Sequence, residues 1–104
     1  MYLARFSYHV LPANRPNALH FIRQEVAAAA QRGLNARLLV PMTRSQDGAA
    51  LQYEVELTNL DQLDDLRQHG GGSEGDTESW MRSFSEILLS PPAVEILRVD
   101  ETRA

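Results

Sequence analysis

Residues 51–57 read LQYEVEL, and this stretch decides the fold class. Its apolar residues alternate strictly with polar ones, and a period of two predicts a strand with one apolar face. Residues 2–11 alternate in the same way. The expected apolar face comprises Tyr2, Ala4, Phe6, Tyr8, Val10, Leu51, Tyr53, Val55 and Leu57, and the expected polar face comprises Arg5, Ser7, His9, Gln52, Glu54 and Glu56.

Helical spacing follows each of these strands. Residues 15–32 predict a first helix, with Asn14 as its N-cap and Gly33 just past its end. Its apolar stripe is Leu19, Ile22, Val26 and Ala29. After the 51–57 strand, Thr58 or Asn59 is expected to cap a short helix carrying Leu60, Leu63 and Leu66, and a further helix is expected to begin at Asp76 or Thr77.

Two further strands complete the order. Residues 34–42 predict a strand. Because proline lacks a backbone donor, this strand is expected to lie at a sheet edge or to end near Pro41. Asp47-Gly48 signals the hairpin turn that follows, and residues 93–99 predict the last strand. The order βαββαβ predicts a ferredoxin-like α+β fold, a four-stranded antiparallel sheet in the order 4-1-3-2 with both helical layers on one face.

Composition narrows the function classes. The chain has 104 residues, which suits a single domain over 1–104, with 100–104 as a flexible tail. There is no cysteine, and all ten basic residues are arginine, so a thiol nucleophile and a lysine Schiff base are excluded. A net charge of −4 disfavours nucleic acid and anionic membranes as partners. With no signal-like or membrane-spanning run, we expect a cytoplasmic protein.

The polar face of the sheet holds the first candidate site. His9 beside Glu54 or Glu56 would provide an imidazole oriented by a carboxylate, which suits general base catalysis near neutral pH. Arg5, Ser7 and Glu56 are the expected substrate contacts on the same face. The alternative is a structural, ion-paired face on which Arg5 and Arg37 balance the glutamates.

The second candidate site flanks a glycine-rich loop. His69 as a catalytic group and Trp80 as a substrate contact would line a pocket for a flat substrate, whereas the alternative places Trp80 in the core and His69 at a helix C-terminus. The loop itself matches the dinucleotide fingerprint at Gly70, Gly72 and Gly75. A helix precedes it and acidic residues follow, however, so no cofactor is expected. The three widely separated histidines predict no metal site.

The chain also resembles a known superfamily. The features that carry the resemblance are the βαββαβ order, the split helix at 60–69 (LDQLDDLRQH) and 80–88 (WMRSFSEIL), and the closing 91–99 (PPAVEILRV). Together they resemble the dimeric α+β barrel superfamily, and within it the antibiotic-biosynthesis-monooxygenase-like and NIPSNAP-like groups. The resemblance implies a homodimer paired through its sheets, a small-molecule ligand held between sheet and helices, and cofactor-independent oxygenation of an aromatic or polyketide-like compound.

The resemblance does not extend to haem degradation. Haem-degrading members use an asparagine on the first strand plus a tryptophan and a later histidine. This chain has Ser7 and His9 on that strand, and His69 precedes Trp80. Two further alternatives remain. One is a non-catalytic homodimer that binds a small molecule or a protein. The other is an RNA-binding sheet, which the inward aromatics and the acidic charge disfavour.

Overall fold

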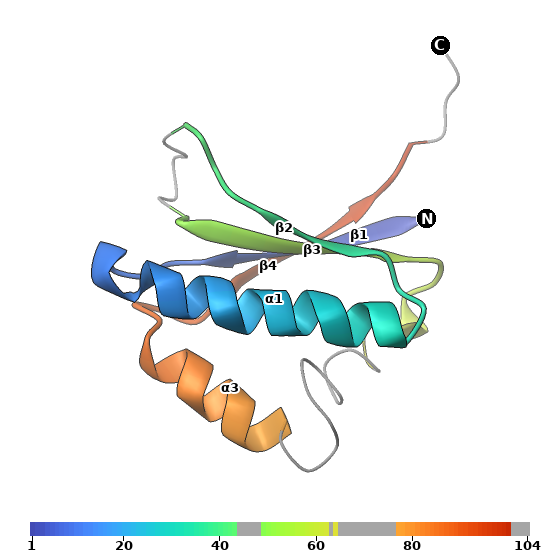
Figure 1. The fold of residues 1–104 in the computed structure, drawn as a ribbon. Coiled ribbons are helices and arrows are strands. Elements are labelled where there is room, and N and C mark those ends of the chain that lie inside the picture. Colours follow the sequence, from blue (N-terminus) through green and yellow to red (C-terminus); the bar gives the residue numbers. More distant parts are fainter. Residues whose placement is uncertain (44–48, 63, 65–76, 101–104) are drawn as a thin grey trace.

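The computed structural model describes residues 1–43, 49–62, 64 and 77–100, and for 77–81 the backbone alone. Its elements follow the predicted βαββαβ order (Figure 1). They are β1 (Tyr2–Tyr8), a 3₁₀ turn η1 (Pro12–Asn14), α1 (Arg15–Gln31), β2 (Ala36–Leu39), β3 (Leu51–Leu57), α3 (Thr77–Glu86) and β4 (Ala93–Arg98).

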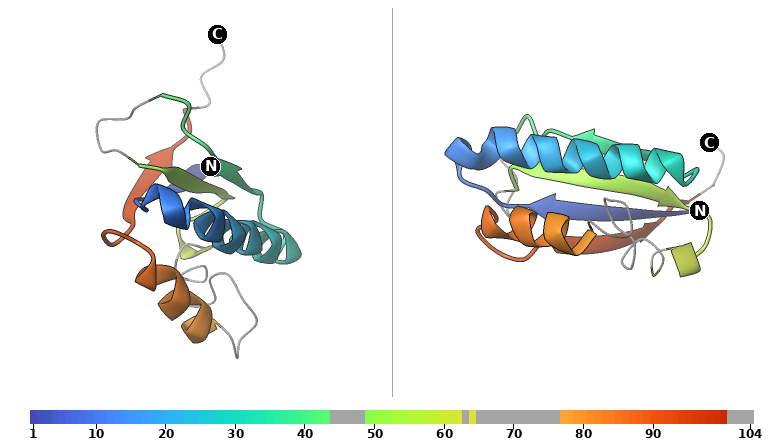
Figure 2. Two further views of the ribbon diagram at one scale, coloured as in Figure 1. Left: turned by 60° about the vertical axis from the view of Figure 1, so that its left-hand side comes forward. Right: turned by 60° about the horizontal axis from the view of Figure 1, so that its bottom comes forward.

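The four strands form one antiparallel sheet in the order β2-β3-β1-β4, which confirms the predicted topology. Both α1 and α3 lie on the same side of the sheet, with α1 along its β2–β3 half (Figures 1 and 2). The opposite face carries no helix of the described chain. As predicted, β2 is an edge strand, and it ends before Pro41.

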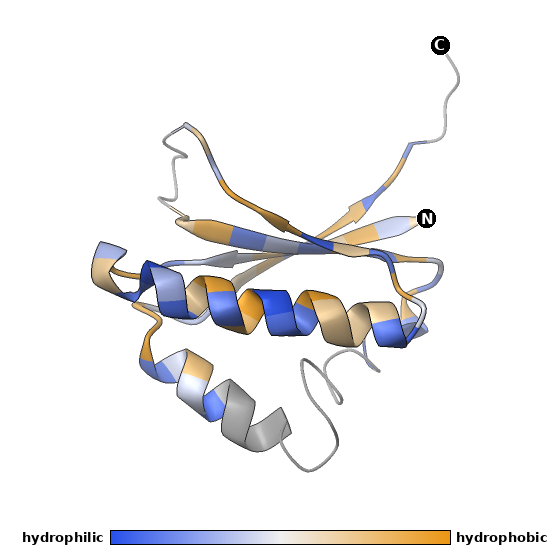
Figure 3. Cartoon of the chain, in the orientation of Figure 1, coloured by the Kyte–Doolittle hydropathy of each residue, from blue (hydrophilic) through white to orange (hydrophobic). Residues whose placement is uncertain are grey.

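The core lies between the sheet and the helices. Hydrophobic and hydrophilic residues alternate along β3 (Figure 3), and the predicted apolar sets face the helices. Tyr53 and Ile22 are among the largest fully buried side chains. Phe84 of α3 packs on Tyr8 at a ring-centroid distance of 4.9 Å and stacks on Phe21 of α1 at 5.1 Å. The two helices therefore meet over the end of β1.

Both ends of α1 lie at the residues that the sequence pattern predicts. Asn14 is the N-cap residue, as predicted, but it is also the last residue of η1 and its side chain makes no capping hydrogen bond. Pro16 occupies the first turn, where its missing N–H costs nothing. At the other end Gly33 has φ +76°, the left-handed conformation that ends many helices and that glycine adopts without strain.

Several segments depart from the expected bounds. The first strand ends at Tyr8 and not at Leu11, since the Leu89 N–H donates to the His9 carbonyl at 2.8 Å and ties the chain to the segment after α3. The predicted cap at Asn59 is confirmed: its Oδ1 accepts from the Gln62 N–H at 3.2 Å. The Asp47-Gly48 turn, the glycine loop, most of the short helix and residues 101–104 lie outside the described residues.

Candidate functional site

On the open face of the sheet, strand register brings one carboxylate between two arginines. Glu54 of β3 lies opposite Arg5 of β1 and Arg37 of β2. Arg5 donates from Nε and Nη2 to Glu54 Oε2 at 3.0 and 2.9 Å, and Arg37 donates from both nitrogens to Oε1, with Nε at 3.1 Å. The Glu54 side chain is only 2% exposed, while Arg37 is 64% exposed.

This pairing fixes the charge state of Glu54. Burial by itself raises the pKa of Glu54, but the hydrogen bonds and charges of Arg37 and Arg5 outweigh burial and lower it below the usual 4.5. A carboxylate with a lowered pKa is a weak base at neutral pH. Glu54 is therefore part of an ion-paired network with Arg5 and Arg37.

The other predicted residues of this face are spread along the strands. Ser7 is buried and its hydroxyl accepts a hydrogen bond from Gln52 Nε2 at 3.2 Å. Glu56 lies opposite Leu3, on the far side of Glu54 from His9. His9 follows the end of β1, four residues beyond Arg5, which is about 13 Å of extended chain. The register thus brings Glu54 to Arg5 and Arg37, and it does not bring it to His9 as the sequence analysis expected.

Of the second candidate site, the structure describes only the backbone of Trp80. Trp80 is a residue of α3, as its helical spacing predicted. His69 lies outside the described residues. The pairing of His69 with Trp80 at a substrate pocket remains a prediction.

A third group of polar side chains, which the sequence analysis missed, lies on the helix-covered face. Glu25 of α1 accepts a hydrogen bond from the Tyr8 hydroxyl at 3.2 Å. Tyr53 lies diagonally across from Tyr8 on the same face, because Tyr8 faces Leu51 and Tyr53 faces Phe6. The Tyr53 hydroxyl is buried and has no hydrogen-bond partner in the part of the chain that the structure describes. We call Tyr8, Glu25 and Tyr53 the Tyr–Glu–Tyr cluster.

Burial dominates the electrostatics of this cluster. It raises the pKa of Glu25 to about 7, although the hydrogen bond from Tyr8 acts in the opposite direction. Burial, with the Glu25 carboxylate second, also raises the pKa of both tyrosines, so their hydroxyls stay protonated. The cluster therefore combines a carboxyl group that titrates near neutrality with two hydrogen-bond donors, which are the components of an acid–base site.

A sequence signal for Glu25 does exist. The buried residues of α1 are Ala18, Ile22 and Ala29, and Glu25 continues their spacing of three and four. A charged residue within an apolar helical stripe is unusual, because burying a charge is unfavourable unless it is paired or neutralised. A glutamate at a position of the buried helical stripe is therefore the sequence signal that indicates Glu25.

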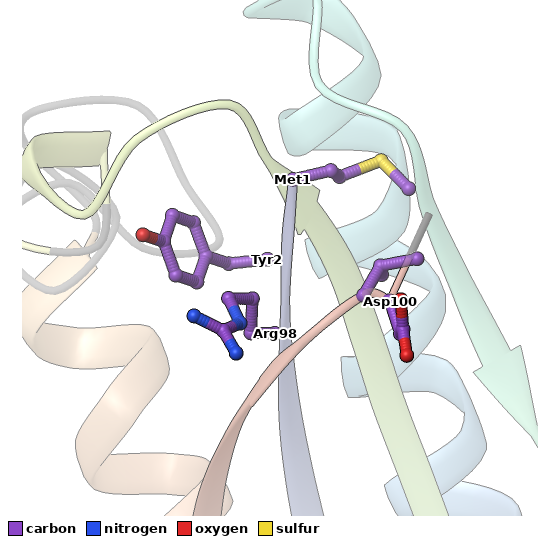
Figure 4. Close-up of a pocket in the computed structure, with 5 residues that line it drawn as sticks. Met1, Tyr2, Arg98 and Asp100 are labelled. Atoms are coloured by element: carbon purple, nitrogen blue, oxygen red, sulfur yellow. The ribbon is translucent and has the colours of Figure 1, made fainter. Parts of the chain in front are cut away.

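A cavity of about 420 Å³ lies elsewhere, at the end of the sheet near the N-terminus, and is lined by Met1, Tyr2, Arg98, Val99 and Asp100 (Figure 4). None of the predicted site residues lines it. Among the described residues no three His, Asp or Glu side chains gather as a metal site would require. Nor does any described helix have the length and apolar character needed to cross a membrane.

The fold is similar to three solved structures. An antibiotic biosynthesis monooxygenase superposes with a TM-score of 0.71 at 15% identity, covering 96% of this chain and 99% of that one. The protein Rv0793 from Mycobacterium tuberculosis gives 0.68 at 19% identity, with both chains fully covered. A protein described as a putative antibiotic biosynthesis monooxygenase from Bordetella bronchiseptica gives 0.60 at 17% identity, covering 95% and 96%.

These likenesses establish the fold class. The chain has the ferredoxin-like α+β fold of antibiotic-biosynthesis-monooxygenase-like proteins, as the resemblance implied, over nearly its whole length. The resemblance to NIPSNAP-like proteins is not confirmed. No family model matches the sequence, and no curated protein is similar to it. At identities this low the likeness concerns the fold alone.

Proposed function

We propose that this protein is a homodimeric, cofactor-independent monooxygenase-like enzyme that acts on an aromatic or polyketide-like molecule. The observation that carries the proposal is an apolar strip on the helix-covered face of β1 and β4. Phe6 of β1 faces Val94, and Ala4 faces Ile96. Val94 and Ile96 remain 43% and 39% exposed, although they lie on the face where the core packs. A flat apolar ligand would cover this strip.

The proposed oxygenation balances without a cofactor. When an activated CH₂ group reacts with O₂ to give a C=O group and water, the two C–H bonds supply the electrons and all atoms balance. The protein then has to bind the ring, exclude water and accept a proton from the substrate. Proteins of this fold that carry the monooxygenase name support this choice of reaction.

Within this proposal the predicted residues keep distinct roles. His9 and His69 are acid–base candidates, and Trp80 is a candidate ring contact. Arg5, Ser7 and Glu56 lie on the open face, away from the apolar strip, and are candidate polar contacts for a ligand held between the two paired sheets. Glu54, predicted as a catalytic group, is assigned a structural role instead, because both of its oxygens accept hydrogen bonds from arginines and its pKa is lowered. His9→Ala and His69→Ala test the acid–base assignments by their loss of turnover.

Oxygen consumption tests the proposed activity. We expect the purified protein to accelerate oxygen uptake with anthrone- and quinol-type substrates over the rate without protein. Val94→Glu should abolish the acceleration, because it places a charge on the apolar strip. Leu89→Glu is the matched control, since Leu89 is an exposed apolar residue outside the strands. Folded protein that consumes no oxygen with any of these substrates refutes the activity, and ligand-dependent stabilisation without turnover identifies a binding protein.

The proposed dimer would pair the open faces of two sheets. Across that face β2, β3, β1 and β4 present Arg37, Glu54, Arg5 and Glu95 in one row, so opposite charges alternate. Half-buried Leu3 and Leu97 lie opposite each other beside this row. Sedimentation should give twice the mass of the 11.7 kDa chain, and Leu3→Asp should convert it to a monomer. Leu11→Asp, at an exposed position outside the sheet, is the control, and a monomeric native protein refutes the dimer.

A further inference from the structure

We propose that the Tyr–Glu–Tyr cluster is a binding site for a single aromatic or enolic hydroxyl group, with Glu25 as the acceptor of its proton. The proposal deepens the proposed function and rests on it only for the identity of the natural ligand. The site differs from the predicted ones: Tyr8, Glu25 and Tyr53 lie on the opposite face of the sheet from Arg5, Glu54 and Arg37.

The first support is that three elements bring these side chains near one another. Tyr8 comes from β1, Tyr53 from β3 and Glu25 from α1, so each side chain is held by a separate packed element. The Tyr8 hydroxyl donates to Glu25 Oε2 at 3.2 Å, and the Glu25 carboxylate acts electrostatically on both tyrosines. Groups fixed by packing need little reorganisation when a ligand arrives.

The second support is the orphaned hydroxyl of Tyr53. The residue is 1% exposed, and its Oη is buried with no hydrogen-bond partner among the residues described. A buried hydroxyl without a partner is unfavourable by about 1–3 kcal/mol, and a catalytic role or a bound molecule is one explanation for such a group. Glu25 is only partly buried, so one side of the cluster borders the surface of the protein.

The donors and acceptors specify the ligand chemistry. Tyr53 Oη can donate to a ligand oxygen, and the Glu25 carboxylate can accept from a ligand O–H, so a hydroxyl oxygen satisfies both groups at once. Aromatic rings border the cluster. The ring centroids of Phe6 and Tyr53 are 5.6 Å apart, and those of Phe84 and Tyr8 are 4.9 Å apart. A hydroxyl carried on an aromatic or enolic carbon therefore fits better than an aliphatic alcohol.

The chemical step is a proton transfer. The ligand O–H bond breaks, a new O–H bond forms on Glu25, and the electron pair stays on the ligand oxygen as a phenolate or enolate. The Tyr53 hydroxyl then donates to that anion. Burial raises the pKa of Glu25 to about 7, so the carboxylate is a stronger base than an ordinary glutamate while still ionised at mildly alkaline pH.

Among the described residues, few other charges act on this cluster. Glu25 acts electrostatically on Tyr8 and Tyr53, and Arg32, just past the end of α1, acts on Tyr53. The described side chain that α3 presents to the cluster is Phe84, and β2 contributes Leu38 to the same core. The arginine of β2, Arg37, is bound to Glu54 on the other face. Titration near pH 7 in this site is therefore assigned to Glu25.

Binding of phenol, with toluene as the matched ligand that lacks the hydroxyl, tests the site without oxygen or turnover. We expect calorimetry at pH 8 to give at least about tenfold tighter binding of phenol than of toluene, because hydrogen bonds to charged groups are strong. Glu25→Gln and Tyr53→Phe should each remove most of this preference and leave toluene binding unchanged. Glu86→Gln, at an exposed position of α3, should change neither ligand.

The pH dependence adds a readout that a structural role would not move. Phenol affinity of the native protein should rise between pH 6 and pH 8 as Glu25 ionises, and Glu25→Gln should make it flat. Equal binding of phenol and toluene, no saturable phenol binding, or an unchanged preference in folded Glu25→Gln would each overturn the site. Tyr53→Phe provides the second variant should Glu25→Gln fail to fold. Phenol preference without oxygen uptake overturns the proposed function and leaves the site standing.

Discussion

Two glutamates on opposite faces of the same sheet have opposite electrostatics. Glu54 lies on the open face, and two arginines bind its two oxygens. Glu25 lies on the helix-covered face, where a tyrosine hydroxyl at 3.2 Å is its hydrogen-bond donor. The pKa of Glu54 is lowered, whereas burial raises the pKa of Glu25 to about 7.

The difference teaches which carboxyl group is available for chemistry. A carboxylate neutralised by two guanidinium groups is stabilised in its charged form, so it holds strands together and rarely accepts a proton near neutral pH. A desolvated carboxyl group without a cation is poised to exchange protons at pH 7. The sheet therefore separates a carboxylate held in an ion-paired network from a carboxyl group suited to proton transfer.

The largest expected effect is the loss of Glu54. Glu54→Ala should lower the free energy of unfolding by about 3 kcal/mol at pH 7, because it leaves two arginines without their common partner. Urea denaturation at one fixed protein concentration measures it. Since the folded pKa of Glu54 is lowered, the native pair contributes above the usual pKa of 4.5 and is lost as the pH falls through the lower folded value. The deficit of the variant should therefore shrink in strong acid.

The control for this variant is Glu95→Ala. Glu95 lies on the same face, opposite Arg5, but is exposed, so its removal should change stability by less than about 0.5 kcal/mol. A Glu54→Ala protein as stable as Glu95→Ala would show that the two arginines gain as much from water as from Glu54. The claim that Glu54 stabilises the sheet through its two arginines would then be wrong.

The next effect has the opposite sign. At pH 8, Glu25→Gln should raise the free energy of unfolding by about 2 kcal/mol, because it removes a desolvated charge and retains an acceptor for Tyr8. The folded pKa of about 7 lies above the usual 4.5, so the native stability is full below about 4.5 and falls as the pH rises to about 7. At pH 4 the variant and the native protein should be equally stable.

Denaturation curves at pH 4, 6 and 8 measure this dependence. Glu86→Gln, which replaces an exposed carboxylate on α3, is the control and should be equally stable at all three values. A Glu25→Gln protein that is less stable than the native one at pH 8 would mean that the ionised Glu25 is well solvated or well paired. In that case the claim that burial raises the pKa of Glu25 and destabilises its ionised form would be wrong.

The sequence predicted the sheet and one side of this comparison. Strict alternation at 2–8 and 51–57, with Pro41 at an edge, fixed the strand order and the face of each side chain. Because the strands are neighbours and antiparallel, Arg5, Arg37 and Glu54 were expected on one face. Alternation does not give the register between the strands. It therefore could not show that Arg5, and not His9, lies opposite Glu54.

The helix-covered site escaped the sequence analysis for a different physical reason. Glu25 shares the stripe of Ile22 and Ala29, but the height of that stripe above Tyr8 and Tyr53 depends on how α1 docks on β3. Docking is a tertiary property that helical period does not fix. The sequence alone shows that Glu25 lies in an apolar stripe, but it does not show that Tyr8 and Tyr53 are its neighbours.

A smaller effect separates the two tyrosines of the cluster. Tyr8→Phe should lower the free energy of unfolding by about 1 kcal/mol, because it removes the hydroxyl that donates to Glu25. It should also raise the pKa of Glu25 further, since that hydrogen bond lowers it. Tyr53→Phe should leave stability unchanged or increase it slightly, because the hydroxyl has no partner in the described structure. Equal losses in both variants would contradict the assignment of Tyr53 as the orphaned donor.

The smallest expected effect concerns the outer arginine of the open face. Arg37→Ala should cost less than about 1 kcal/mol, because Arg37 is 64% exposed and Arg5 still binds Glu54. Arg5→Ala should cost more, since Arg5 is half as exposed and lies on the central strand β1. Carboxyl chemical shifts should show the pKa of Glu54 rising in Arg37→Ala. An Arg37→Ala loss as large as that of Glu54→Ala would mean that Arg5 alone cannot compensate the buried charge, and that the network acts as one cooperative unit.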